Sequence, residues 1–132
     1  MVGTDGVVMV EAAVTGTDAS FGGMHIDPDR LDLLVRGSTQ FAAGVWQRID
    51  RHADVQQAAV ALAITNANGR VYGRPLGNTM SFGRSHQLPH TIVVPQPAAL
   101  VRRGDVTGTE LRERVLAATR RVFADAGAVS GG

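Results

Sequence analysis

The sequence contains no cysteine and no lysine. The absence of cysteine excludes disulfides, thiolate metal sites and a cysteine nucleophile. The absence of lysine excludes a lysine Schiff base and the lysine of a phosphate-binding P-loop. All 13 basic residues are therefore arginine. Together with abundant alanine, glycine and valine, this usage is typical of a bacterial protein from a GC-rich genome.

Long apolar runs and a marked excess of one charge are also missing. The longest apolar runs are a few residues, whereas a helix that spans a bilayer needs about 20. Residues 1–6 carry no basic side chain, so they do not resemble a signal peptide. A net charge of +1 gives no electrostatic footprint for nucleic acid. We expect a soluble cytoplasmic protein with no membrane partner and no nucleic-acid partner.

The length and the composition are those of an ordinary globular domain. The chain has 132 residues, of which 44% are hydrophobic and 19% charged. This length is close to the commonest domain size, and this balance is unlike that of disordered chains. We therefore predict one domain over residues 1–132, with frayed ends at 1–6 and 128–132.

Two segments have the periodicity of amphipathic helices. The first begins at Asp27–Pro28, a capping residue followed by proline at the first helical position. The second follows Thr107 and Glu110, which have the spacing of a capping box, and it ends at Gly127. The two predicted apolar stripes are Leu31, Leu34, Val35, Ser38, Ala42, Val45, Trp46 and Ile49, and Leu111, Val115, Ala118 and Val122.

Four short segments are typical of β-strands. They are rich in apolar and β-branched residues and are bounded by glycine, proline or asparagine. The predicted strands are residues 7–15, 58–65, 70–73 and 91–94. Pro95 and Pro97 are expected to end the last of them. Residues 98–103 are compatible with one turn of helix or with another strand.

The order of elements predicts an α+β fold. Residues 66–69, Asn-Ala-Asn-Gly, have the composition of a hairpin turn, so the strands on either side of it are expected to pair. The order β-α-β-β-β-α then favours a single layer of mixed or antiparallel sheet. Two amphipathic helices are expected to pack on one face of that sheet.

The polar stretch 74–90 is the predicted binding segment. Loops of more than about 12–15 residues without secondary structure are uncommon in compact domains and often carry function. Its donors and two imidazoles can bind a polar or anionic ligand and move protons near neutral pH. The alternative is a solvated surface excursion. The predicted ligand-binding residues are Asn78, Arg84, Ser85 and, as an apolar wall, Trp46, and the predicted proton carriers are His86 and His90.

Glu11 is a second candidate for acid–base chemistry. It lies in the middle of the predicted strand 7–15, among apolar neighbours. Burial of its carboxyl group would raise the pKa and suit it to act as an acid or base. The alternative is a solvated glutamate at a sheet edge.

The spacing of His86 and His90 does not predict a metal site. Two histidines four residues apart share a face only in a helix. Pro89 disfavours a helix here, and a metal ion would need at least one further ligand. The chain also lacks a glycine-rich nucleotide motif. We therefore predict no metal and no cofactor.

The sequence leaves two function classes open, and the polar side chains of residues 74–90 favour the first of them. The first is a domain that binds a small polar or anionic molecule. This class includes a cofactor-independent acid–base enzyme of the isomerase, lyase or hydrolase type. The second is a noncatalytic interaction module or oligomer-forming protein. A cleft beneath residues 74–90 would favour the first. An exposed apolar patch around Phe41, Val45 and Trp46 would favour the second. In either case we expect a homo-oligomer.

Overall fold

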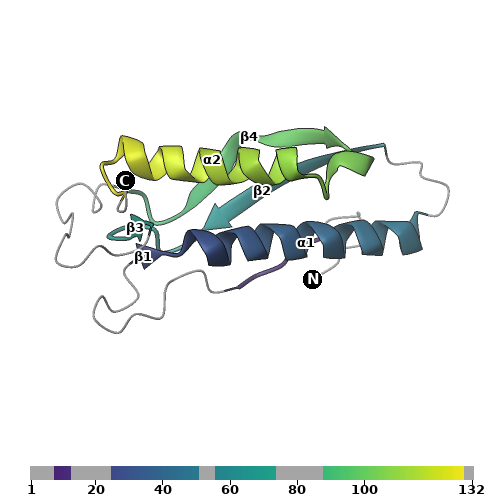
Figure 1. Cartoon of the computed structure of the whole chain (residues 1–132), viewed down its shortest axis with the longest axis horizontal. Helices are drawn as coiled ribbons and strands as arrows, with labels where there is room; N and C mark the ends of the chain where they lie inside the picture. The colour runs from purple at the N-terminus through teal and green to yellow at the C-terminus, as the bar shows by residue number, and fades with distance from the viewer. Residues whose placement is uncertain (1–7, 13–24, 51–55, 74–87, 130–132) are drawn as a thin grey trace.

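A computed structural model describes residues 8–12, 25–50, 56–73 and 88–129 of the chain. These residues form two helices and a few short strands, so the predicted mixed α+β class is confirmed (Figure 1). In chain order the elements are β1 (His25–Ile26), α1 (Pro28–Ile49), β2 (Gln57–Ile64), β3 (Val71–Tyr72), β4 (Ile92–Arg102), the 3-10 turn η3 (Arg103–Asp105) and α2 (Thr109–Asp125).

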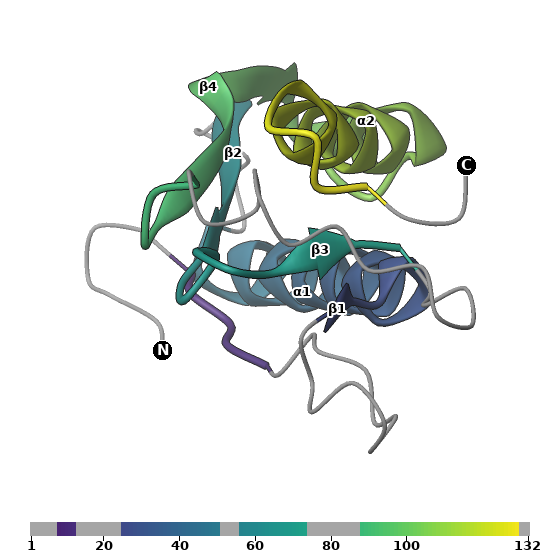
Figure 2. The ribbon, with the colours of Figure 1, turned by 90° about the vertical axis from the view of Figure 1, so that its left-hand side faces the viewer.

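The two helices lie on the same side of a ribbon formed by β2 and β4 (Figure 2). Helix α2 lies beside β4, and α1 lies beside α2. The short strands β1 and β3 pair in parallel at the end of the molecule where α1 begins (Figure 1). None of the described helices is long and apolar enough to cross a membrane.

Helix α1 begins where the sequence predicts it. The side chain of Asp27 accepts a hydrogen bond from the backbone N–H of Asp29 at 3.0 Å, and Pro28 occupies the first helical position. The first turn of a helix leaves backbone N–H groups without partners, and proline has no N–H to leave unpaired there. The helix buries Leu31, Val35, Thr39 and Ala42, which recur at three- and four-residue steps.

Helix α2 begins later than the capping-box spacing suggests. Its N-cap residue is Gly108, and no side chain caps the first turn, so Thr107 does not have the predicted role. The end of the helix is as predicted. Gly127 has φ 70°, and the N–H groups of Gly127 and Ala128 bond to the carbonyls of Ala124 and Phe123 at 2.9 and 2.8 Å. This pair of bonds is a Schellman motif.

The predicted hairpin between residues 58–65 and 70–73 is wrong. The turn residues do adopt left-handed conformations, with φ 58° at Asn66 and 80° at Gly69. However, β2 pairs antiparallel with β4, and β3 pairs in parallel with β1. The N–H of Ala67 bonds instead to the carbonyl of His90 at 2.9 Å, and Asn68 Nδ2 bonds to the carbonyl of Leu88 at 2.8 Å. These two bonds hold the turn against the start of β4.

Strand β4 continues through the two prolines that were expected to end it. Its register with β2 shifts between Val60, which faces Ala99, and Leu62, which faces Val94. Pro95 and Pro97 therefore fall in the irregular part of the ladder, where a missing N–H costs no regular pairing. Residues 98–102 are strand, which decides between the two alternatives left open by the sequence, and η3 follows.

The core lies between the helices and the ribbon. One cluster surrounds Phe123, which is fully buried, and contains Ile26, Leu31, Ile64 and Tyr72. A second cluster joins the two helices to β4 through Val35, Ala99, Leu111 and Val115. Ala128, which follows the end of α2, is also fully buried.

The segment 8–12 is not a strand in the structure. Only Val8 takes part in an isolated bridge, and Met9 and Val10 are exposed. Within the described ranges, the first strand in chain order is instead β1, next to the cap of α1. Residues 9–12 are all exposed, and a strand also requires a neighbour with matching backbone bonds.

Candidate functional site

A groove with a volume of about 950 Å³ runs along one side of β2. The described residues that line it come from the segment 8–12, from α1 and from β2, with Thr65 and Val106 at its margins. No residue of β4 is among them, so the groove lies on the side of β2 that faces away from its pairing partner. The lining residues of α1 are Leu34, Ser38, Thr39, Ala42, Trp46, Ile49 and Asp50.

One edge of β2 borders this groove and pairs with none of the residues that the structure describes. The N–H of Arg103 bonds to the carbonyl of Gln56 at 2.8 Å, so the backbone groups of Gln56 point toward β4. In an antiparallel ladder this direction alternates along the strand. The N–H and C=O groups of Ala59, Ala61 and Ala63 therefore point away from β4. Among the described residues, β2 pairs with β4 alone.

Side chains divide along the same alternation. Ala58 and Ile64 are buried and Val60 and Leu62 are half-buried on the face toward the helices. Gln57 and the row of alanines at 59, 61 and 63 are exposed on the other face. Within the described part of the chain, this edge of β2 thus combines backbone groups that have no strand partner with side chains that are too small to obstruct an approaching chain.

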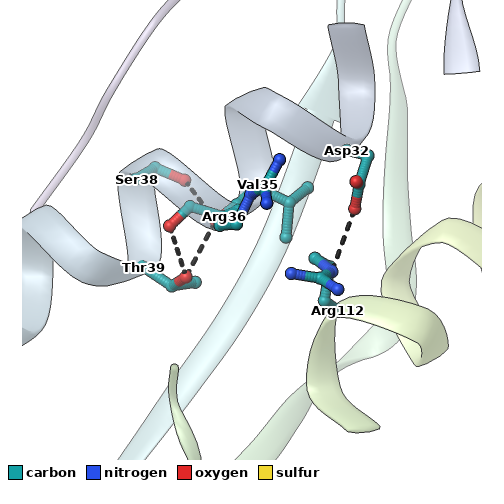
Figure 3. Close-up of polar contacts among 6 residues, drawn as sticks. All are labelled: Asp32, Val35, Arg36, Ser38, Thr39 and Arg112. Atoms are coloured by element: carbon teal, nitrogen blue, oxygen red, sulfur yellow. Dashed lines mark hydrogen bonds and ion pairs between the residues drawn. The ribbon is translucent and has the colours of Figure 1, made fainter. Parts of the chain in front are cut away.

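The floor of the groove is apolar although it contains two hydroxyl groups. Ser38 Oγ and Thr39 Oγ1 donate to the carbonyl of Val35 at 3.1 and 2.9 Å (Figure 3). Because both hydroxyls already donate a hydrogen bond to a carbonyl of their own helix, they can lie in an apolar surface without another partner. Leu34 and Ala42 supply the remaining apolar surface.

Charge in the groove is negative. The described lining residues include Glu11 and Asp50 and no arginine or histidine. Asp50 is engaged by Arg103, whose Nη1 donates to Asp50 Oδ2 at 2.5 Å. Glu11 is exposed in the segment 8–12, which also lines the groove. The groove therefore favours neutral or cationic groups over anions.

The structure brings together two of the residues singled out in the sequence. Glu11 and the half-buried Trp46, which come from different predicted sites, both line the groove. His90 is exposed just before β4, away from the groove, and its carbonyl accepts the bond from Ala67. Four further predicted residues lie outside the described ranges, namely Asn78, Arg84, Ser85 and His86.

Within the described ranges, no group of three or more histidine, aspartate or glutamate side chains could hold a metal ion. Among the described residues, only Tyr72 has a clearly shifted pKa: burial raises the pKa of its phenol above the ordinary value of 10.0, Arg120 opposes the rise and Asp32 adds to it. The ring of Tyr72 packs against Phe123 with the ring centroids 5.9 Å apart. This tyrosine belongs to the core cluster and not to the groove.

The free edge of β2 is the feature that sequence reasoning missed. Its signal was the absence of charge from residue 58 through residue 69, combined with alanine at every second position. The same run is also typical of one half of a hairpin, which is how we interpreted it.

Comparison of the chain with protein-family models, with curated proteins and with solved structures finds no match.

Proposed function

We propose that this protein is a noncatalytic interaction module that binds an extended peptide segment in the groove beside β2. The observation that supports the proposal is that β2 pairs on one side only among the residues that the structure describes, while its other edge borders a groove floored by α1. A peptide strand added to a sheet edge gains affinity from main-chain hydrogen bonds and specificity from alternate side chains.

The composition of β2 fits this role. Natural edge strands are commonly protected against pairing by charges, prolines or bulges. The residues of β2, Gln57–Ile64, include no charged residue and no proline. A two-stranded ribbon also gains stability from a third strand. A strand edge that carries neither charge nor proline and faces a groove is suited to accept another strand.

The groove also limits the chemistry of the peptide. Side chains that point to the α1 floor would contact Leu34, Ala42 and Trp46, so every second residue should be apolar. The alternate residues would lie on the face of Ala59, Ala61 and Ala63. An arginine or lysine near Glu11 would add a favourable charge contact.

A peptide of alternating valine and threonine, made soluble by a terminal lysine and labelled with a fluorophore, tests this proposal. We expect saturable binding measured by fluorescence anisotropy. Ala61→Pro removes an N–H from the free edge, and Ser38→Phe fills part of the floor. Each substitution should weaken the affinity at least about tenfold.

Leu100→Thr is the matched control because Leu100 is exposed on β4 and does not line the groove. This variant should bind the peptide as the unmodified chain does. Circular dichroism and thermal unfolding identify variants that have lost the fold. Absence of binding to the unmodified chain, or equal binding by correctly folded Ala61→Pro and Ser38→Phe variants, contradicts the proposal.

A second candidate function is the binding of an amphipathic small molecule. It is favoured by the presence of an aromatic wall, Trp46, and a carboxylate, Glu11, in a groove of ligand size. Dodecylamine and dodecanoate are suitable probes, and the fluorescence of the single tryptophan reports their binding. The amine should bind more tightly than the acid, and Glu11→Gln should remove that preference. Equal binding of both probes argues against this candidate.

The cytoplasmic location and the homo-oligomeric state remain predictions. Native mass spectrometry of freshly purified protein measures the subunit count together with any retained mass. A retained organic molecule would favour the small-molecule candidate. A higher oligomer without bound molecules would favour the interaction module.

A further inference from the structure

We propose that residues 8–12 form a strap that closes on the free edge of β2 as a third strand and competes with a partner for the groove. The regulatory meaning of this closure rests on the proposed function, whereas the pairing itself is tested separately. The strap is the segment Val-Met-Val-Glu-Ala, which lines the groove on the wall opposite β2.

The position of the strap supports closure. All five of its residues line the same groove as β2 residues 57–63. In Figure 2 the segment begins beside the lower end of β2 and runs down past α1, and in Figure 1 it lies below α1 whereas β2 lies above it. To pair as a third strand, the segment would have to approach β2 to the spacing of neighbouring strands, about 4.8 Å.

The side chains of the strap alternate in the manner that closure requires. Val8, Val10 and Ala12 share one face of an extended chain, and Met9 and Glu11 share the other. If these three apolar side chains faced α1, the exposed side chain of Val10 would become buried against the apolar floor of the groove. Met9 and Glu11 would lie on the exposed face, beside the alanine row of β2, where a carboxylate keeps its contact with water.

The other edge of the ribbon is a poor acceptor. Strand β4 contains Pro95 and Pro97 and an irregular register, both of which disfavour strand addition. The strap also reaches the β2 edge within its own molecule. Twelve residues, 13–24, connect it to β1, and a chain of this length spans up to about 40 Å.

Closure has a direct consequence for binding. A closed strap occupies the N–H and C=O groups of Ala59, Ala61 and Ala63 that a partner strand would use. A partner must therefore displace the strap, and its apparent affinity falls with the fraction of molecules that are closed.

The absence of cysteine permits a clean cross-linking experiment. Met9→Cys is combined in turn with Ala59→Cys, Ala61→Cys or Ala63→Cys, which together sample the registers of pairing on the exposed face. Met9→Cys with Leu100→Cys is the matched control. Leu100 faces Ala59 in the ladder but lies one strand further away. A closed strap would place it about 10 Å from Met9, too far for a disulfide.

We expect one of the three pairs to form an intramolecular disulfide in dilute protein at least about tenfold faster than the control. Mass spectrometry shows the loss of two hydrogens, and gel filtration shows an unchanged size. Three pairs that close no faster than the control overturn the strap. Disulfides that form only between two molecules also overturn it, because they show that the two positions do not meet within one molecule.

The cross-linked protein then tests competition. It should fail to bind the valine–threonine peptide, and reduction should restore binding. If the oxidised and reduced forms bind equally, the strap does not compete and the proposal is wrong. If the disulfide forms but neither form binds, the pairing of the strap stands and the proposed function fails. If no pair closes but the peptide binds, the function stands and the strap is wrong.

Discussion

Arg103 joins the end of β4 to the end of α1 by donating from its guanidinium to Asp50. Nη1 contacts the carboxylate at 2.5 Å and Nη2 contacts the Asp50 carbonyl at 3.3 Å. Asp50 also caps α1, since its N–H bonds to the carbonyl of Trp46 at 2.8 Å. The two residues therefore fix the distance between α1 and the ribbon at one end of the groove.

Removal of this contact should destabilise the fold. We expect Arg103→Met to lower the free energy of unfolding by about 1–2 kcal/mol, because both side chains are mostly buried and Asp50 would lose its charged donor. Arg112→Met is the control, since its ion pair with Asp32 at 3.0 Å is more exposed and should contribute about 0.5 kcal/mol. Urea unfolding measures both values, and equal losses would contradict the assigned role of Arg103.

The pH dependence of stability should contain a contribution from Tyr72. Burial raises the pKa of its phenol above 10.0 in the folded state. The neutral form is therefore favoured by folding, so the contribution is complete below pH 10 and is lost as the pH rises through the folded pKa. Tyr72 is the single tyrosine, and its absorbance near 295 nm reports ionisation directly. A midpoint at or below pH 10 contradicts this expectation, and Tyr72→Phe provides the control for the stability change.

Two phenylalanines should differ sharply on truncation. Phe123 is 0% exposed at the centre of the larger core cluster, whereas Phe41 is 50% exposed on α1. Phe123→Ala should cost about 3–5 kcal/mol of unfolding free energy, and Phe41→Ala less than about 1 kcal/mol. Chemical denaturation of the two variants measures the difference. A larger loss of unfolding free energy than this for Phe41→Ala would show that Phe41 packs in the core.

Substitution of glycine by alanine should have opposite effects at two positions. An added Cβ at Gly37 in α1 meets no atom within 4 Å, so Gly37→Ala should stabilise the protein by up to about 1 kcal/mol. Gly127 has φ 70° in the Schellman motif, so Gly127→Ala should destabilise it by about 1 kcal/mol. Thermal unfolding measures both, and a shift of the same sign at both positions would contradict the assigned helix end.

The helices were predictable because their signals are local. The cap at Asp27, the proline that follows it and the glycine stop at Gly127 each act within one turn of their helix. Strand pairing was not predictable in the same way. Asn66 and Gly69 favour a turn, but the turn does not determine which strand pairs with the segment that follows it. That segment, β3, pairs with β1, and Tyr72 of β3 packs against Phe123, which is distant in the sequence.

The candidate site was predictable only in part. Glu11 and Trp46 could be selected by residue type, but their meeting in one groove depends on how α1 and the segment 8–12 lie beside β2. The free edge of β2 depends on which strand becomes its partner. A local pattern does not contain that information, because a paired and an unpaired edge strand have the same alternation.

Amide hydrogen exchange of β2, with and without the valine–threonine peptide, tests the central claim most directly. The account predicts that the peptide slows exchange at Ala59, Ala61 and Ala63, whose N–H groups point to the free edge, and leaves Ala58 and Val60 unchanged because they already face β4. Uniform protection along β2, or no protection at the three alanines when the peptide is saturating, would contradict it.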